Sequence, residues 1–200
     1  MNILCPLCHL SLSRADKYWH CDNNHHFDKA KQGYTNLLLV QNKRSKLPGD
    51  DANMVSARKR FLSQAYYRPL AKAISQLALQ QLDHKAQASI IDAGCGEGYY
   101  TQALHTTLSN HGIAVDTVGI DISKFAIKAA ASRQKKIQWF VASSSHLPVT
   151  SHTCDIVLSL FSLLPEQAFH RTLKSKGTLI AVSYSPLLAH ETPDHLVFRL

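Results

Sequence analysis

The second half of the chain alternates short apolar runs with stretches whose apolar residues recur at helical spacing. Ile-, Val- and Leu-rich runs predict strands at 89–93, 115–120, 137–142, 154–161 and 178–184. The stretches between them predict helices at 99–110, 124–133 and 166–174, and a further helix is expected from about Tyr66 to Leu82. Strands joined by helical crossovers predict a doubly wound parallel sheet of the α/β class.

A glycine-rich turn follows the first of these strands. Asp92 ends the strand, and Gly94, Gly96 and Gly98 separate it from the next helix. This order brings backbone close to a nucleotide-like ligand, although an ordinary strand-to-helix turn is the alternative. Asp121 ends the second strand, 23 residues after Gly98. An acidic side chain at that point is placed to accept hydrogen bonds from both ribose hydroxyls, which favours a nucleoside ligand.

Two acidic residues narrow the choice of nucleoside ligand. The dinucleotide pattern Gly-x-Gly-x-x-Gly is absent, and Asp92 and Glu97 flank or occupy the loop. Two carboxylates would repel a diphosphate but would suit a cation such as S-adenosylmethionine, which carries an ammonium and a sulfonium and no phosphate. The motif resembles the first motif of the class I S-adenosylmethionine-dependent methyltransferases. That resemblance implies that Gly94 to Gly98 line the methionine end and that Asp121 holds the ribose.

Composition predicts one globular core with a small appendage, because 45% of the 200 residues are apolar and 18% are charged. No apolar run approaches the ~18 residues of a membrane span, and no charged-then-apolar leader opens the chain. We therefore expect no membrane partner and a cytoplasmic location. Five cysteines, two of them at Cys-x-x-Cys, fit metal binding or free thiols better than a disulfide framework.

The first 30 residues predict a structural zinc site. Cys5, Cys8, Cys21 and His25 form the pattern Cys-x2-Cys-x12-Cys-x3-His, which matches a tetrahedral Cys3His centre. His26 competes with His25 as the fourth ligand. Four protein ligands would leave no open position for catalysis. A segment this short cannot build an adequate core unaided, so Zn²⁺ would supply much of its folding free energy.

The following segment predicts the end of this ribbon and a basic linker. A turn at Gly33 and a short strand up to residue 40 would complete the ribbon. Residues 41–50 are polar, basic and broken by Pro-Gly, and Asp50 or Asp51 could cap a helix. The apolar face of that helix would contain Met54, Ala57, Phe61 and Leu62. The expected parts are a zinc-binding ribbon at 1–40, a linker and helix at 41–65, and a cofactor-binding domain at 66–200.

The formal charge of +8 is concentrated near the N-terminus. Residues 1–60 hold 10 Lys and Arg against 5 Asp and Glu, a net of +5, and residues 61–200 hold 12 against 9, a net of +3. This excess suits an anionic partner such as nucleic acid, but a solvated basic surface is equally expected from charge alone. The candidates for phosphate contact are Lys43, Arg44, Lys46, Arg58, Lys59 and Arg60.

Several motifs in this order resemble the RlmA family of large-subunit ribosomal RNA guanine-N1 methyltransferases. They are Cys5 to Cys8 with Cys21 and His25 through Asp28; Gly33-Tyr34 with Asn36 to Leu38; Lys43 to Ser45 with Pro48 to Asp50 and Ala57-Arg58; Asp92 to Tyr100; and Leu147-Pro148 after Ser143-Ser144. The resemblance implies methylation of guanine N1 in a 23S rRNA hairpin, a zinc ribbon that helps to recognise that hairpin, and often a homodimer. It places Cys5, Cys8, Cys21 and His25 on zinc, and Tyr67, Gly96, Glu97 and Asp121 at the cofactor.

The C-terminal region departs from this family. Family members continue past residue 200, so we expect a methyltransferase sheet apparently truncated after its fifth strand. A catalytically impaired RNA-binding remnant is therefore the alternative function. His195 is the better match to a family histidine near the cofactor, His190 is the second candidate, and a frayed tail is the plainer interpretation of this segment. No residue stands out as the general base.

Overall fold

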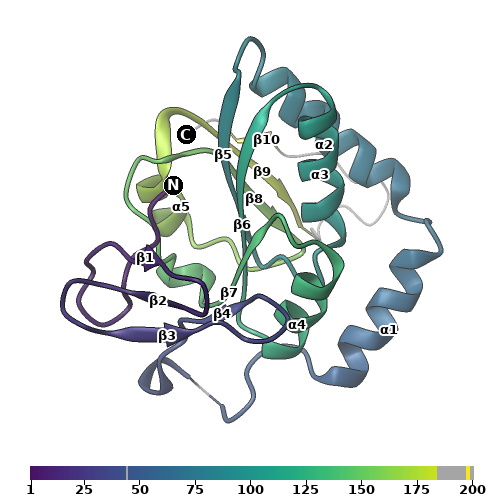
Figure 1. The fold of residues 1–200 in the computed structure, drawn as a ribbon. Helices are drawn as coiled ribbons and strands as arrows, with labels where there is room; N and C mark the ends of the chain where they lie inside the picture. The colour runs from purple at the N-terminus through teal and green to yellow at the C-terminus, as the bar shows by residue number, and fades with distance from the viewer. Residues whose placement is uncertain (44, 184–196, 199–200) are drawn as a thin grey trace.

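A seven-stranded sheet forms the centre of the computed structural model, which describes residues 1–43, 45–183 and 197–198 (Figure 1). Its strand order is β10-β9-β8-β5-β6-β7-β4. All neighbouring strands are parallel except β10, which pairs antiparallel with β9. The strands are β4 (Thr35–Asn36), β5 (Gln87–Ala93), β6 (Ala114–Asp121), β7 (Gln138–Val141), β8 (Cys154–Leu160), β9 (Leu173–Val182) and β10 (Val197–Phe198).

The apolar runs become strands because both faces of the sheet are covered. Every residue of β8 is buried, and in β5 Ile90 contributes to the core on one face while Ile91 contributes to the core on the other. This confirms the predicted parallel α/β sheet. The sheet does not end at the fifth predicted strand, however, because the antiparallel β10 adds a further strand beside β9. β9 begins earlier than predicted, at Leu173, and its pairing with β8 is irregular between Cys154 and Ile156. Gly177 lies at this irregularity, where a Cβ would be 2.9 Å from the Cys154 carbonyl oxygen.

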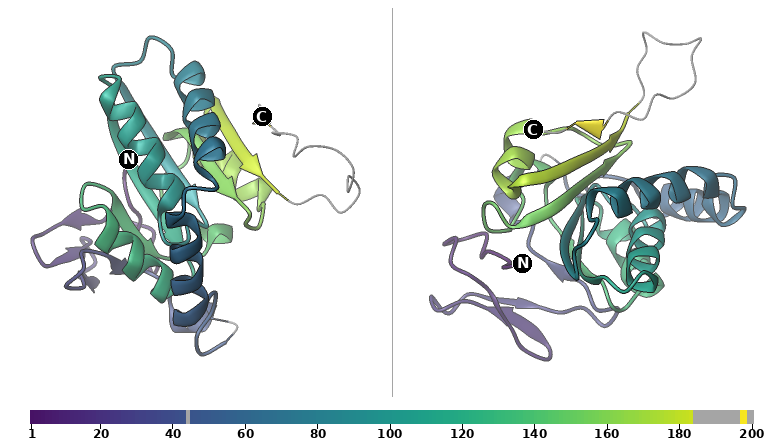
Figure 2. Two further views of the ribbon diagram at one scale, coloured as in Figure 1. Left: turned by 90° about the vertical axis from the view of Figure 1, so that its right-hand side faces the viewer. Right: turned by 90° about the horizontal axis from the view of Figure 1, so that it is seen from above.

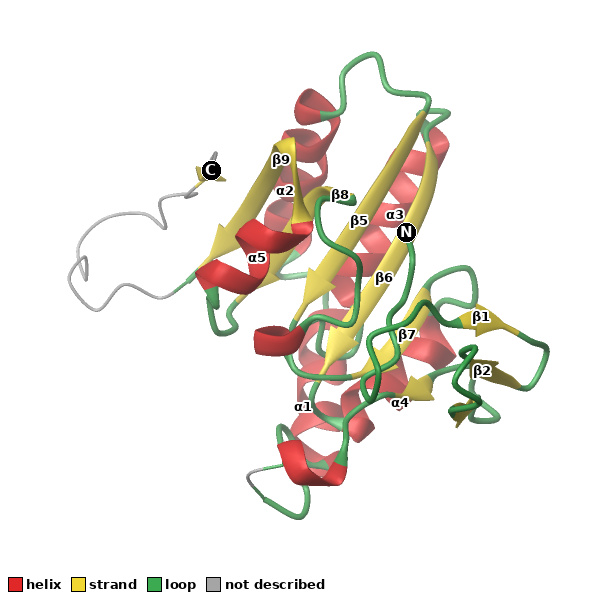
Figure 3. Ribbon diagram, turned by 90° about the vertical axis from the view of Figure 1, so that its left-hand side faces the viewer, coloured by secondary structure: helices red, strands yellow, loops and turns green. Residues whose placement is uncertain are grey.

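The helices divide between the two faces of the sheet (Figures 2 and 3). α2 (Arg68–Gln81) and α3 (Tyr99–Asn110) pack together on one face, with α4 (Lys124–Arg133) further along the same side. α5 (Glu166–Thr172) lies on the opposite face. None of the helices in the described part of the chain is long and apolar enough to cross a membrane.

The N-terminal ribbon packs on the same face as α5. Its antiparallel strands are β1 (Ser13–Arg14), β2 (Tyr18–His20) and β3 (His26–Asp28), in the order β1-β2-β3. Trp19 contacts Phe140 of β7 edge-on, with ring centroids 5.5 Å apart. Ile3 is also buried there and pairs with Val149. The ribbon therefore shares its apolar core with the sheet.

The strand after Gly33 has a different partner from the one predicted. The turn is present, with Gly33 at φ +102°, but β4 pairs in parallel with β7 at the edge of the large sheet. An isolated bridge, from Lys29 to Thr35, connects β4 back to the segment after β3. The prediction that this strand completes the ribbon is therefore wrong. β7 pairs with β6 on one side, and β4 pairs with its other side. Without β4, that outer edge of the sheet would be unpaired.

The linker leads through a short 3-10 helix, η1 (Val40–Asn42), into α1 (Ala52–Ser63). Asp51 caps α1, since its Oδ1 accepts the N–H groups of Asn53 and Met54 at 2.8 and 2.9 Å. Of the predicted apolar face, Leu62 is buried, but Met54 and Phe61 are 52% and 50% exposed. α1 packs beside α4, and its outer surface is not covered by any other described element.

Candidate active site and metal centre

A cleft of about 460 Å³ opens at the carboxyl ends of the central strands. It lies where the strand order reverses, since β5 is followed in the chain by β6 on one side, and β8 lies on the other. Ligands of open α/β sheets bind at such points. The lining residues are Gly49, Asp50, Arg58, Phe61, Leu62, Tyr67, Asp92, Gly94, Cys95, Gly96, Glu97, Tyr99, Tyr100, Asp121, Leu160, Phe161 and Ser162.

The glycine turn forms the floor of this cleft. The N–H groups of Gly94 and Cys95 both donate to the Ile120 carbonyl, at 2.8 and 2.9 Å, which fastens the loop to β6. Gly94 and Gly96 line the cleft, and both have positive φ. Gly98 does not line it: a Cβ there would be 2.8 Å from Trp139 and 3.0 Å from Ala130. The third glycine therefore allows α3 to begin close to α4 and β7.

Asp121 lies at the end of β6 and faces the glycine loop. Its Oδ2 accepts the Gly96 N–H at 2.9 Å, and its Oδ1 accepts the Ser123 N–H at 2.8 Å. Burial raises its pKa, and nearby Asp50 adds to the rise; these two N–H groups and Arg58 oppose it. The carboxylate is thus held in a fixed orientation at the cleft wall, where a ribose could donate to its remaining lone pairs.

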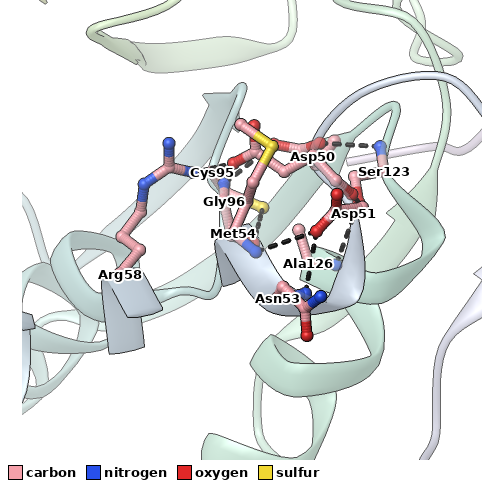
Figure 4. Close-up of polar contacts among 10 residues, drawn as sticks. Asp50, Asp51, Asn53, Met54, Arg58, Cys95, Gly96, Ser123 and Ala126 are labelled. Atoms are coloured by element: carbon pink, nitrogen blue, oxygen red, sulfur yellow. Dashed lines mark hydrogen bonds and ion pairs between the residues drawn. The ribbon is translucent and has the colours of Figure 1, made fainter. Parts of the chain in front are cut away.

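The linker contributes a wall of the cleft that sequence analysis missed. The Asp50 carbonyl accepts the Ser123 hydroxyl at 2.6 Å, and the Asp50 carboxylate pairs with Arg58 of α1 (Figure 4). A Cβ on Gly49 would be 2.9 Å from Ile122 and Ser123. Asp50 and Arg58 therefore face the cleft, whereas the sequence suggested helix capping and phosphate contact. The Pro-Gly-Asp turn was the available signal, but its partner is 73 residues away.

Asp92 and Glu97 provide two buried carboxylates beside the glycine loop. Asp92 Oδ2 accepts the Thr101 hydroxyl at 2.6 Å, and Glu97 Oε2 pairs with Arg133. Their other oxygens, Asp92 Oδ1 and Glu97 Oε1, are buried without a hydrogen-bond partner among the described residues. Burial raises the pKa of Asp92 to about 7, and Asp121 adds to this rise. Unsatisfied carboxylate oxygens of this kind fit a cationic ligand, because a cation would satisfy them and favour their charged form.

Aromatic side chains form the outer wall. Tyr67, at the start of α2, contacts Phe61 with ring centroids 5.7 Å apart and Phe161 at 6.3 Å. The ring centroids of Tyr100 and Phe161 are 6.4 Å apart. The structure thus places Tyr67 in the cleft, together with Asp92, Gly94, Gly96, Glu97 and Asp121. The predicted His195, its alternative His190 and the basic residue Arg44 lie outside the described residues.

Ser143 and Asp155 are polar residues at the ends of strands that lie away from the cleft. Ser143 and its neighbours form a turn in which the Ser143 hydroxyl caps η2 (Ser144–His146), and they line a different cavity between the ribbon and α5. Asp155, at the opposite end of β8, accepts hydrogen bonds from Lys85, Lys174 and the Ser89 N–H. Burial alone would raise the pKa of Asp155, but these three partners hold it below its usual value. Asp155 therefore connects β5, β8 and β9.

The predicted metal ligands converge in the ribbon. One ligand atom each from Cys5, Cys8, Cys21 and His25 lies within 4.8 Å of all the others. His25 Nδ1 is 3.5 Å from the sulfurs of Cys5 and Cys21, and the Cys8 and Cys21 sulfurs are 3.6 Å apart. Bond lengths of about 2.3 Å to sulfur and 2.0 Å to nitrogen give tetrahedron edges of roughly 3.5–3.8 Å, so the set fits Zn²⁺. His26 instead packs against Tyr18, with ring centroids 5.0 Å apart.

Both parts of the chain match known protein families. Residues 3–46 match the family described as "RlmA, N-terminal", a zinc ribbon. Residues 90–178, which contain the glycine loop, match the family described as "Methyltransferase domain". The first match covers the four metal ligands, and the second runs from within β5 to within β9.

Relatives align along most of this chain. A Bacillus subtilis protein, provisionally named a 23S rRNA (guanine-N(1)-)-methyltransferase, is 35% identical over 89% of the chain. A Streptomyces fradiae protein named 23S rRNA (guanine(748)-N(1))-methyltransferase is 30% identical over 90% of it. The chain spans 62% of the length of each of these two relatives.

Solved structures share the fold. A Methanococcus maripaludis protein, provisionally named an S-adenosyl-L-methionine-dependent methyltransferase, superposes with a TM-score of 0.57 at 18% identity, over 70% of this chain and 68% of its own. A Listeria monocytogenes protein, provisionally named a class I S-adenosylmethionine-dependent methyltransferase, gives 0.52 at 18% identity over 61% and 47%. The chain therefore combines a segment similar to the RlmA zinc ribbon with a segment that matches the methyltransferase-domain family and has the fold of the class I methyltransferases.

Proposed function

We propose that this protein transfers a methyl group from S-adenosylmethionine to N1 of a guanine in a hairpin of 23S rRNA. The main support is one arrangement: a cleft with two unsatisfied buried carboxylate oxygens lies at the switch point of a methyltransferase sheet that also carries an RlmA-type zinc ribbon. The names of the Bacillus and Streptomyces relatives suggest the substrate. An rRNA substrate also implies a cytoplasmic location.

For the cofactor, the proposal assigns roles residue by residue. Asp92 and Glu97 would face the cationic methionine end, Gly94 and Gly96 would let it approach the backbone, and Asp121 would hold the ribose. Tyr67 would cover the outer side. Gly98 would act indirectly, by allowing the helix after the loop to pack closely. His195 remains a proposed cofactor contact by resemblance alone.

The chemistry depends chiefly on alignment. S-adenosylmethionine supplies an electrophilic methyl group on a sulfonium. The cleft residues would hold guanine N1 in line with that methyl and exclude water, which converts a bimolecular encounter into an effectively unimolecular step. N1 must lose its proton during transfer. A base contributes roughly 10²–10⁴-fold in such reactions. The target guanine must also leave its stack to reach the cleft.

Basic side chains on the ribbon side would hold the RNA backbone. Arg14, Lys29, Lys135 and Lys136 line a cavity of about 210 Å³ between the ribbon and the C-terminal end of α4. None of these four forms an ion pair with an acid among the described residues. Contacts to phosphate from such groups fix position without reading sequence. A second copy of the chain could extend this surface, as the family resemblance suggests.

The decisive experiment measures methyl transfer from labelled S-adenosylmethionine to 23S rRNA that lacks the mark. We expect incorporation at guanine N1, located by nuclease digestion and mass spectrometry. Folded, zinc-loaded protein that incorporates no label would contradict the proposal. Calorimetry then separates the alternative: an RNA-binding remnant would bind rRNA in a salt-sensitive manner but would give no heat with S-adenosylmethionine.

A further inference from the structure

Arg133 is the last residue of α4, and its side chain reaches the glycine loop beside the cleft. Its Nε donates to the Glu97 carbonyl at 3.2 Å, and its Nη2 donates to the Glu97 carboxylate. Its Nη1 donates to Gln102 Oε1 of α3 at 3.4 Å, and its guanidinium carbon lies 5.9 Å from the centroid of the Tyr99 ring. One side chain from α4 therefore holds the end of the loop and the first turn of α3.

The Glu97 carboxylate depends on this partner because its side chain is only 1% exposed. A buried carboxylate is costly unless a counter-charge and hydrogen bonds compensate it. Arg133 supplies both to Oε2, whereas Oε1 has no hydrogen-bond partner in the part of the chain that the structure describes. Glu97 also lines the cleft. Arg133 thus leaves one oxygen of a compensated carboxylate for a group that a ligand brings.

The contact geometry favours arginine at this position. The carbonyl and the carboxylate that Arg133 holds both belong to Glu97, and a planar guanidinium can donate to the two groups at once. A Cβ on the next residue, Gly98, would be 3.0 Å from Ala130, one turn before Arg133 in α4. The close packing of α4 on the loop therefore brings the guanidinium within reach and limits the directions in which the Glu97 carboxylate can point.

We propose that Arg133 is a positioning residue that acts through Glu97 and gives the cleft its preference for a ligand with an ammonium group. In S-adenosylmethionine this group lies on the amino-acid end, which the glycine loop would receive. The inference rests on the proposed function and deepens it, because it assigns ligand preference to a residue that does not line the cleft. An ammonium that donates to Glu97 forms a charge-assisted hydrogen bond, and its strength depends on how the carboxylate is oriented.

The test compares two ligands that differ only in the ammonium. They are S-adenosylhomocysteine and its desamino analogue, which keeps the carboxylate, and calorimetry measures their binding to the zinc-loaded chain without RNA. Wild-type protein should prefer S-adenosylhomocysteine by roughly 10- to 100-fold, as expected for a hydrogen bond between charged groups. In Arg133→Gln and in Glu97→Gln this preference should fall to within about threefold. The double variant should lose no more than Glu97→Gln, because the two side chains act as one unit.

Arg171→Gln is the matched control. Arg171 of α5 also ties neighbouring segments together, since it donates to the Leu147 and Val149 carbonyls at 2.8 and 2.9 Å, but it lines the cavity between the ribbon and α5. This variant should keep the wild-type preference even if its stability falls. Arg133→Lys retains a counter-charge, so it should fold even if Arg133→Gln does not, and its preference should lie between those of the wild type and Glu97→Gln.

An unchanged preference in the Arg133 variants would overturn the inference. Equal weakening of both ligands would overturn it as well, because a merely structural role would lower both affinities without changing their ratio. The outcome is independent of methyl transfer. Wild-type protein that prefers the ligand with the ammonium but methylates no rRNA would contradict the proposed function alone, whereas wild-type protein without this preference would contradict the role of Arg133.

Discussion

Asp92 combines burial with a missing hydrogen bond, and this makes its charge costly before a ligand binds. It is 1% exposed, its Oδ1 has no hydrogen-bond partner within residues 1–43, 45–183 and 197–198, and burial raises its pKa to about 7. A raised folded-state pKa means that ionisation opposes folding. The cost is absent below the unfolded pKa near 4, grows up to about pH 7 and then levels off.

Asp92→Asn should therefore stabilise the ligand-free protein, by an amount that increases between pH 4 and pH 7. Asparagine can still accept the Thr101 hydroxyl, so that bond is kept. Urea unfolding midpoints of both proteins, measured across this range, would show the trend. The same variant should bind S-adenosylmethionine more weakly, as calorimetry would show. A stability difference that does not change with pH would contradict this account of Asp92.

Gly98 provides a second residue-scale prediction, because its space is occupied by Trp139 and Ala130. Gly98→Ala should destabilise the protein by about 1–3 kcal/mol through overpacking, in addition to the left-handed backbone penalty. Gly112→Ala is the matched control: its φ is +80° against +82° for Gly98, but a Cβ there meets nothing within 4 Å. Urea unfolding should show a larger loss at Gly98. Equal losses would mean that the backbone penalty alone matters.

At the level of single residues, the sequence predicted those features that residues close together in the chain form. The order Asp92 to Gly98 and the position of Asp121 were sufficient to place a cleft, and the Cys and His spacing was sufficient for the metal cluster. Asp50 and Arg58 were not predicted as cleft residues, because their placement depends on the Ser123 hydroxyl. Similarly, the spacing alone left His26 as a competitor of His25, whereas the structure brings His25 to the three cysteines and places His26 against Tyr18.

Among the elements, the zinc ribbon permits the sharpest test. His25→Asn should abolish stoichiometric zinc binding, measured by atomic absorption, whereas His26→Asn should retain it because His26 faces Tyr18. Loss of zinc should release Trp19 from Phe140 and increase amide exchange in β4 and β7, since the ribbon shares their core. Equal zinc loss in the two variants would refute the ligand assignment.

The elements themselves were largely predictable where apolar periodicity was strong. The expected helices at 99–110 and 124–133 have the same bounds as α3 and α4. The strand β4 was predicted to pair within the ribbon but pairs with β7. A strand of two residues has too short a sequence pattern to indicate which sheet it joins. The exposed Phe61 of α1 also escaped prediction: helical spacing identifies an apolar face but does not indicate whether that face meets a core or a cleft.

For the whole molecule, charge predicts how RNA binding responds to salt. Lys135→Gln with Lys136→Gln removes two of the cations between the ribbon and α4. If both contact phosphates, 23S rRNA affinity should fall and the slope of log K against log salt should become shallower by roughly 1–2. Lys72→Gln with Lys176→Gln changes net charge equally at other positions and should alter the slope little.

Lys135 also donates to the Gln32 carbonyl, so both double variants must first show wild-type unfolding midpoints. Binding measured from 50 to 300 mM salt then decides: equal weakening by both pairs would show that the basic excess acts as a diffuse field and not as a local phosphate contact.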